Sequence, residues 1–174
     1  MLFPGLSILQ GGFTTHLCTS KNTKTNTMKE RMNINKAEPG IYLAMAASDK
    51  KVDSFELDAK LKELIRIRVS QINGCGYCIN THTKDALKLG ETTQRLFAVS
   101  AWWETPFFTE EERAVLKLAE EVTHISNGGV TDQAYADALN ILGEKKLAQT
   151  IFVMVTINSW NRIAISMHMV AEID

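Results

Sequence analysis

Residues 63–82 read ELIRIRVSQINGCGYCINTH, and this stretch decides the fold. Its apolar residues recur at helical spacing up to about Ile72, and Gly74 then breaks the pattern. A second helical pattern covers about residues 75–89 and ends at a glycine. The stretch therefore predicts two helices joined by a tight turn, with a Cys-x-x-Cys pair at the start of the second helix.

The rest of the chain also carries helical patterns. Apolar spacing predicts a short helix over 40–50 and a long one over 144–167. Capping boxes at Asp53–Glu56 and at Thr109–Glu112 each predict the start of a helix. Two further helices are predicted, one capped by Thr92 that runs through Trp102 and Trp103, and one from Thr131 or Asp132 to near Gly143. Residues 64–69 and 152–157 have strand-like features, but each lies in a periodic segment too long for one strand. The fold class predicted is all-α.

The composition excludes several classes of function. A length of 174 residues and 45% hydrophobic content suit one globular domain. A net charge of −1 gives no electrostatic reason to expect a nucleic-acid partner or an anionic membrane surface. The densest apolar run, 151–157, is shorter than the roughly 20 residues that a membrane helix needs. Three cysteines do not suit a disulfide-stapled secreted scaffold, so we expect a cytoplasmic protein.

The first 27 residues differ in composition from the rest. They contain no Asp or Glu and end in a polar run over 19–27. We expect residues 1–27 to form a poorly ordered tail and 28–174 to form the helical domain. Cys18 lies in this tail and is expected to have no part in the site.

The Cys-x-x-Cys pair indicates thiol redox chemistry. On a helix, Cys75 and Cys78 would lie on one face with Cα atoms about 5 Å apart, which a disulfide can span. A disulfide across so small a loop stabilises little, so its value lies in being formed and broken. A helix N-terminus favours a thiolate at Cys75, the reactive form. His82 lies one turn beyond Cys78 and is a candidate base toward that thiol.

Glu63 is the candidate partner of His82. It lies ten residues before the turn between the two helices, and His82 lies eight residues after Gly74. At about 1.5 Å per residue, the two lie at similar depths of roughly 15 Å and 12 Å, so antiparallel helices would bring them together. Two alternatives stay open, namely that Glu63 is a solvated surface residue and that His82 is a hydrogen-bonded core histidine.

Other interpretations of the motif are weaker. A zinc site of Cys75, Cys78 and His82 would lack a further ligand pair, because His124 and His168 are isolated in sequence. We therefore expect no metal and no cofactor. A thioredoxin-like fold would need alternating strands and helices. The cysteines could also be a simple core pair.

Aromatic and polar residues in the second half are expected to serve packing. Trp102, Trp103, Phe107 and Phe108 flank a proline and favour a core or subunit-interface role, with a pocket lining as the alternative. The apolar last helix, with Trp160 and Met167, suits an oligomer interface. Its buried polar residues need partners and are more often structural than catalytic; they are Asn158, Asn161 and Arg162.

The pattern Glu-x₁₁-Cys-x₂-Cys-x₃-His, met by Glu63, Cys75, Cys78 and His82, resembles the AhpD-like alkylhydroperoxidases of the carboxymuconolactone decarboxylase superfamily. The similarity covers about 28–170. It implies an all-α fold that assembles into trimers or hexamers. It also implies that Cys78 attacks a hydroperoxide and becomes a sulfenic acid, that Cys75 resolves it as a disulfide, and that His82 and Glu63 relay protons. Tyr77 departs from the best-known member, which has a functional histidine there.

The expected function is therefore that of a thiol-dependent peroxidase in a homo-oligomer. Its partners would be a small hydroperoxide and a dithiol, thioredoxin or lipoyl-type reductant, with no nucleic acid and no membrane. One alternative is a non-catalytic oligomeric redox sensor or binding module that forms the Cys75–Cys78 disulfide without turnover. Another is a carboxymuconolactone decarboxylase-type lyase, although that branch generally lacks the cysteine pair.

Overall fold

The computed structural model describes residues 29–172, and the regular structure in that range is helical throughout. The elements are α1 (Ile34–Ala37), α2 (Pro39–Asp53), α3 (Ala59–Asn73), α4 (Gly76–Lys88), α5 (Thr93–Ala98), the 3₁₀ helix η1 (Val99–Glu104), α6 (Glu110–Thr123) and α7 (Asp132–Met167). The all-α prediction is confirmed. The predictions on residues 1–27 and Cys18 lie outside the described range. Within that range, no helix is both long and apolar enough to cross a bilayer.

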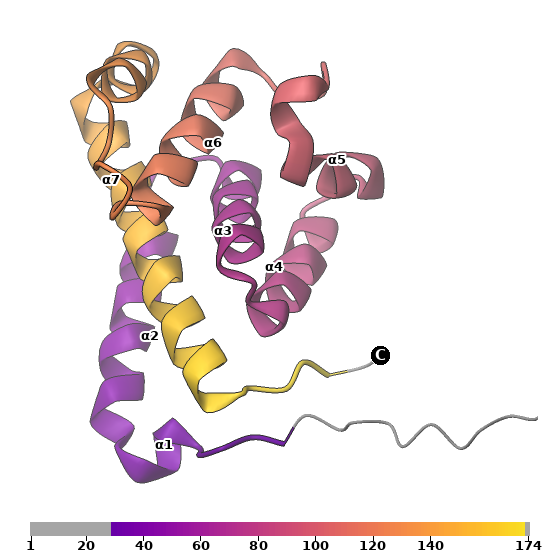
Figure 1. Ribbon diagram of the computed structural model, residues 1–174, viewed down its shortest axis with the longest axis vertical. Coiled ribbons are helices and arrows are strands. Elements are labelled where there is room, and N and C mark those ends of the chain that lie inside the picture. The colour runs from indigo at the N-terminus through magenta and orange to yellow at the C-terminus, as the bar shows by residue number, and fades with distance from the viewer. Residues whose placement is uncertain (1–28, 173–174) are drawn as a thin grey trace, which may run out of the picture.

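Helix α3 is the central element and contacts α4, α6 and α7, as Figure 1 shows. Its side chains are buried on two sides. Ile65 and Val69 belong to one apolar cluster with residues of α6 and α7, whereas Leu64 and Ile67 belong to a second cluster with η1 and α6. A helix buried on two sides carries apolar residues nearly all round, which explains the strand-like alternation of its sequence.

The starts of the predicted helices agree with the structure except at α3, and α1 has no counterpart among the predicted helices. Thr109 and Glu112 form the reciprocal capping box that opens α6, as predicted. The predicted Asp53–Glu56 capping box is wrong, because Asp53 is the last residue of α2. Helix α3 begins five residues later, where the Asp58 side chain accepts a hydrogen bond from the Leu61 backbone N–H at 2.9 Å.

The kink within α7 lies at Gly143, where the backbone is non-helical (φ 69°, ψ 166°). The segment is therefore two helices that meet at one glycine, as the sequence predicted. The second of these helices runs beside α2 and past the turn between α3 and α4 (Figure 1).

The turn between α3 and α4 is a Schellman motif centred on Gly74. Gly74 has φ 71° and ψ 30°, a left-handed conformation that favours glycine. The Cys75 N–H donates to the Ser70 carbonyl at 2.9 Å, and the Gly74 N–H donates to Gln71 at 3.2 Å. Because the chain reverses within two residues, α3 and α4 run antiparallel and adjacent.

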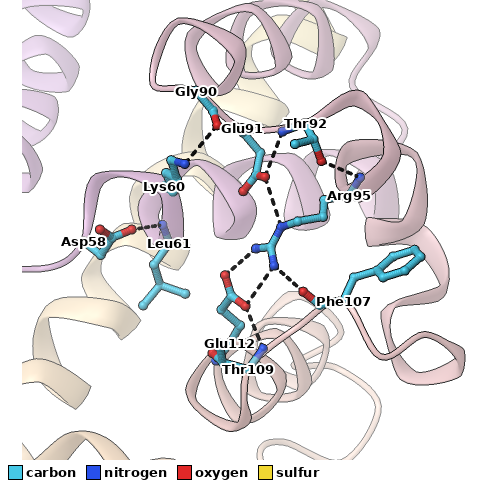
Figure 2. A network of polar contacts seen from close by, with 10 residues as sticks. All are labelled: Asp58, Lys60, Leu61, Gly90, Glu91, Thr92, Arg95, Phe107, Thr109 and Glu112. Atoms are coloured by element: carbon cyan, nitrogen blue, oxygen red, sulfur yellow. Dashed lines mark hydrogen bonds and ion pairs between the residues drawn. The ribbon is translucent and has the colours of Figure 1, made fainter.

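An ion-pair network fixes α5 against α6 (Figure 2). The Arg95 guanidinium pairs with Glu91 at 3.0 Å and with Glu112 at 2.5 Å, and it also donates to the Phe107 carbonyl. The Glu91 carboxylate is only 4% exposed, and its Oε2 has no hydrogen-bond partner in the structure. Arg95 is thus the cation that offsets a buried charge.

We expect Gly74→Ala to lower the free energy of unfolding by about 1–2 kcal/mol, because an L side chain is strained at positive φ. Gly76→Ala is the matched control. A Cβ at either glycine meets no heavy atom within 4 Å, so the two substitutions differ in backbone conformation and not in crowding. Urea denaturation measures both. Equal losses would contradict the account.

Arg95→Met is expected to lower the free energy of unfolding by about 2–3 kcal/mol, because it leaves the Glu91 carboxylate buried without its cation. Lys88→Met removes the exposed pair with Asp85 and is expected to leave the urea midpoint unchanged. If the two variants unfold at the same midpoint, the network is not a stabilising element.

Candidate active site

Three of the four predicted site residues border one cavity of about 560 Å³ between α2, α3, α4 and α7. Glu63, Cys78 and His82 line it, together with Tyr42 and Trp160. We call it the Cys78 pocket. The structure therefore places three of the four predicted residues around one space, and the fourth, Cys75, lies beside Cys78.

Glu63 and His82 form a hydrogen bond of 2.8 Å between Oε2 and Nδ1. The depth argument from the sequence is confirmed, and the alternative of a solvated Glu63 is wrong, since Glu63 is only 5% exposed. Arg66 contacts the other carboxylate oxygen of Glu63 at 2.5 Å. A carboxylate that accepts from Nδ1 fixes the ring proton there and leaves Nε2 of His82 as a proton acceptor.

Cys75 and Cys78 are buried free thiols with their Sγ atoms 2.8 Å apart. A disulfide bond is about 2.05 Å long, so the two sulfurs are hydrogen-bonded and not covalently joined. Cys75 is the N-cap of α4, where its Sγ accepts from the Cys78 backbone N–H at 3.4 Å. The predicted position at the helix N-terminus is confirmed. The redox disulfide stays a prediction.

The two thiols have opposite pKa shifts. The hydrogen bond between the two thiols lowers the pKa of Cys75 to about 7 against the effect of burial, with help from the backbone N–H groups of Cys78 and Tyr77. The same bond and burial raise the pKa of Cys78. The first thiolate therefore forms on Cys75, and Cys78 needs a base to lose its proton.

Asn161 of α7 is a site residue that the sequence analysis placed among structural groups. Its side chain is fully buried, donates to Ser70 Oγ at 3.0 Å and accepts from Asn73 at 2.9 Å. A hydrogen bond with Asn161 also lowers the pKa of both thiols. The only signal in the sequence was a buried amide on an apolar helix, which requires partners without naming them.

Helices α2 and α7 contribute Asp49 and Trp160 to the wall of the Cys78 pocket. Asp49 accepts a hydrogen bond from Trp160 Nε1 at 2.8 Å, and burial nevertheless raises the pKa of its carboxyl group. Trp160 therefore packs within the chain and lines the pocket. By contrast, Trp102 and Phe108 are buried in the cluster around η1 and do not line the Cys78 pocket, so the packing role predicted for them is confirmed.

One set of described residues has the spacing for a metal ion. Ligand atoms of Glu63, His82 and Asp85 lie within 4.8 Å of one another. Both oxygens of Glu63 already bind partners, Arg66 and His82, so an ion would have to displace one of these contacts. The set does not include the cysteines considered for zinc.

This all-α bundle is that of the AhpD-like proteins. The chain belongs to the carboxymuconolactone decarboxylase family, whose model matches residues 39–121. It is 38% identical over 140 residues to the uncharacterised YdfG of Bacillus subtilis, which covers 80% of this chain and 95% of YdfG.

Solved structures share this fold. ATU0492 of Agrobacterium tumefaciens, a protein of unknown function described as a candidate antioxidant defence protein AhpD, has a TM-score of 0.82 and 32% identity, over 84% of this chain and all of that one. The debrominase Bmp8 has a TM-score of 0.71 at 20% identity, over 79% of this chain and 74% of that one. An alkylhydroperoxidase AhpD core protein from Ralstonia eutropha has a TM-score of 0.69 at 18% identity, over 79% of this chain and 74% of that one. The last two show the fold alone.

The thiol titration of the reduced protein is expected to show a first midpoint near pH 7, belonging to Cys75. Ultraviolet absorbance of the thiolate measures it, in a Cys18→Ser background that leaves the site pair as the only thiols. Cys78→Ala is expected to move the midpoint up toward an ordinary thiol value of about 8.5, because the strongest stabilising hydrogen bond is lost. A midpoint near 7 that survives Cys75→Ala would refute the assignment.

Proposed function

We propose that the chain is a thiol-dependent hydroperoxidase that uses Cys78 and Cys75 as its redox pair and His82 with Glu63 as its proton relay. The observation that carries the proposal is that Cys78, His82 and Glu63 line one pocket of about 560 Å³. Such a volume admits an organic hydroperoxide as well as hydrogen peroxide. The family membership and the AhpD description of ATU0492 support the same reaction class.

The oxidative step begins with the proton of the Cys78 thiol. His82 takes this proton on Nε2, and Glu63 holds the resulting imidazolium through the 2.8 Å bond at Nδ1. The Cys78 thiolate attacks the terminal oxygen of the hydroperoxide. A sulfur–oxygen bond forms, the oxygen–oxygen bond breaks, and the departing alkoxide takes the proton from His82. The products are an alcohol and the Cys78 sulfenic acid.

The resolving step uses Cys75. Its thiolate, formed at a pKa of about 7, lies 2.8 Å from the Cys78 sulfur. It attacks that sulfur, a disulfide bond forms, and the hydroxide that leaves becomes water with the second thiol proton. One hydroperoxide is thus reduced to an alcohol and water at the expense of two thiols.

A reductant must return the disulfide to two thiols. We assign this role to a dithiol or to a thioredoxin or lipoyl-type donor, in a cytoplasmic homo-oligomer, a trimer or hexamer. Large apolar side chains on the surface, including Leu43 at 67% and Phe97 at 82% exposed, support subunit contacts.

Cys78→Ser is expected to abolish hydroperoxide consumption in the presence of dihydrolipoamide. His82→Gln is expected to slow it by about 10²- to 10⁴-fold, because the Cys78 thiol then lacks its base. Steady-state loss of cumene hydroperoxide measures both. His124→Gln is the matched control, since His124 is exposed and lies outside the pocket.

Full activity in Cys78→Ser would overturn the proposal. One oxidation of the pair without turnover would instead identify a redox sensor. An activity that survives loss of both cysteines would favour a decarboxylase-type lyase. Release of bromide from a bromopyrrole would favour a debrominase, the reaction for which the fold neighbour Bmp8 is named.

A further inference from the structure

The two thiols open onto two different cavities. Cys78 lines the Cys78 pocket with Glu63 and His82. Cys75 does not line that pocket and instead lines a second cavity of about 440 Å³, which we call the Cys75 pocket. The sulfurs lie only 2.8 Å apart, so a disulfide between them would border both pockets.

The Cys75 pocket lies between the start of α4 and the chain that follows α7. Its wall consists of Gly74, Cys75, Gly76 and Tyr77 on one side and residues from Ala164 to Ala171 on the other. Figure 1 shows the segment after α7 passing close to the turn between α3 and α4. The residues that line this pocket include no Asp, Glu, Lys or Arg, whereas the wall of the Cys78 pocket has six such side chains.

His168 is the basic side chain of the Cys75 pocket. It caps the C-terminus of α7 in the left-handed conformation, with φ 54° and ψ 47°. Its backbone is held by hydrogen bonds at the helix end, where its N–H donates to the Ile165 carbonyl at 3.2 Å. Each cavity therefore contains one cysteine and one histidine, Cys78 with His82 and Cys75 with His168.

We propose that the reducing thiol enters through the Cys75 pocket and attacks Cys75, with His168 as the base that takes its proton. This inference rests on the proposed peroxidase function and adds the site of the electron donor to it. The oxidising substrate and the reductant would then reach the same disulfide through two different pockets and not compete for one.

The chemistry balances for a small dithiol donor. The first donor thiolate attacks Cys75 Sγ, a bond forms between donor and Cys75, and Cys78 leaves as a thiolate. The second donor thiol then attacks the donor sulfur of this mixed disulfide, and Cys75 leaves. The donor is oxidised to its own disulfide, and the two protons that it loses are the two that the cysteine pair regains.

The wall of the Cys75 pocket selects for the kind of donor. A lining without Asp, Glu, Lys or Arg suits a slender uncharged dithiol better than a charged thiol such as glutathione. Dihydrolipoamide is a probe with these properties, and glutathione is the charged comparison.

The test separates the two half-reactions. In the first, the reduced protein is mixed with cumene hydroperoxide; in the second, protein oxidised beforehand with diamide is mixed with dihydrolipoamide. Quenched samples are followed by the mass change of the Cys75–Cys78 pair. His168→Asn removes the base and keeps a residue that tolerates positive φ. His82→Gln and His124→Asn are measured beside it.

We expect His168→Asn to slow the second half-reaction by roughly 10- to 100-fold at neutral pH and to leave the first within about twofold. The deficit is expected to vanish above about pH 9, where a free thiol ionises unaided. His82→Gln is expected to slow the first half-reaction. His124→Asn is expected to slow neither half-reaction. Val170→Trp narrows the Cys75 pocket and is expected to slow the second half-reaction. Leu89→Trp narrows the Cys78 pocket and is expected to slow the first half-reaction.

The proposal is overturned if His168→Asn leaves reduction by dihydrolipoamide unchanged, if it slows both half-reactions equally, or if its deficit does not depend on pH. Failure of the peroxidase function is a different result. In that case the wild-type protein does not react with hydroperoxide in the first half-reaction, whereas reduction of the diamide-oxidised pair still reports on His168.

Discussion

The reversal of the chain at Gly74 is the constraint on which the site depends. The left-handed glycine turns α3 back as α4 within two residues, so the two helices lie antiparallel and adjacent. The antiparallel arrangement places Glu63 opposite His82, and the turn makes Cys75 the N-cap residue of α4. Glu63 and His82 lie about ten and eight residues from the turn in sequence. They meet because the position of the turn puts them at similar depths on the two helices.

Buried amides of α7 tie this hairpin to the rest of the bundle. Asn73, the last residue of α3, donates to both Asn158 and Asn161 at 2.9 Å. Asn161 then contacts Ser70 and the thiols. Polar groups buried in an apolar helix interface are costly unless every partner is present, so the network permits one arrangement of α7 against the turn. The geometry of the thiols is thereby fixed from a helix almost ninety residues away in sequence.

The features that could be predicted from the sequence are those that depend on local residue patterns. The two helices of the hairpin, the capping box at Thr109 and the kink at Gly143 follow from residue spacing and turn chemistry, and the position of Glu63 follows from counting residues. The start of α3 was misplaced because Asp53 and Asp58 are both good N-cap residues, and only packing decides between them. The contacts of Asn161 and the approach of the segment after α7 to Cys75 depend on how α7 packs, which no local pattern specifies.

The capping role of Cys75 links the state of the thiols to the stability of α4. As a thiolate, its sulfur accepts hydrogen bonds from the first turn of the helix and from Cys78. A disulfide sulfur is a weak acceptor, so oxidation removes most of the cap and with it part of what holds the first turn. An interaction that stabilises the reduced Cys75–Cys78 pair more than the oxidised pair raises the reduction potential of the pair. In the proposed redox cycle, the helix end would therefore make the pair more oxidising than the same two cysteines in a flexible loop.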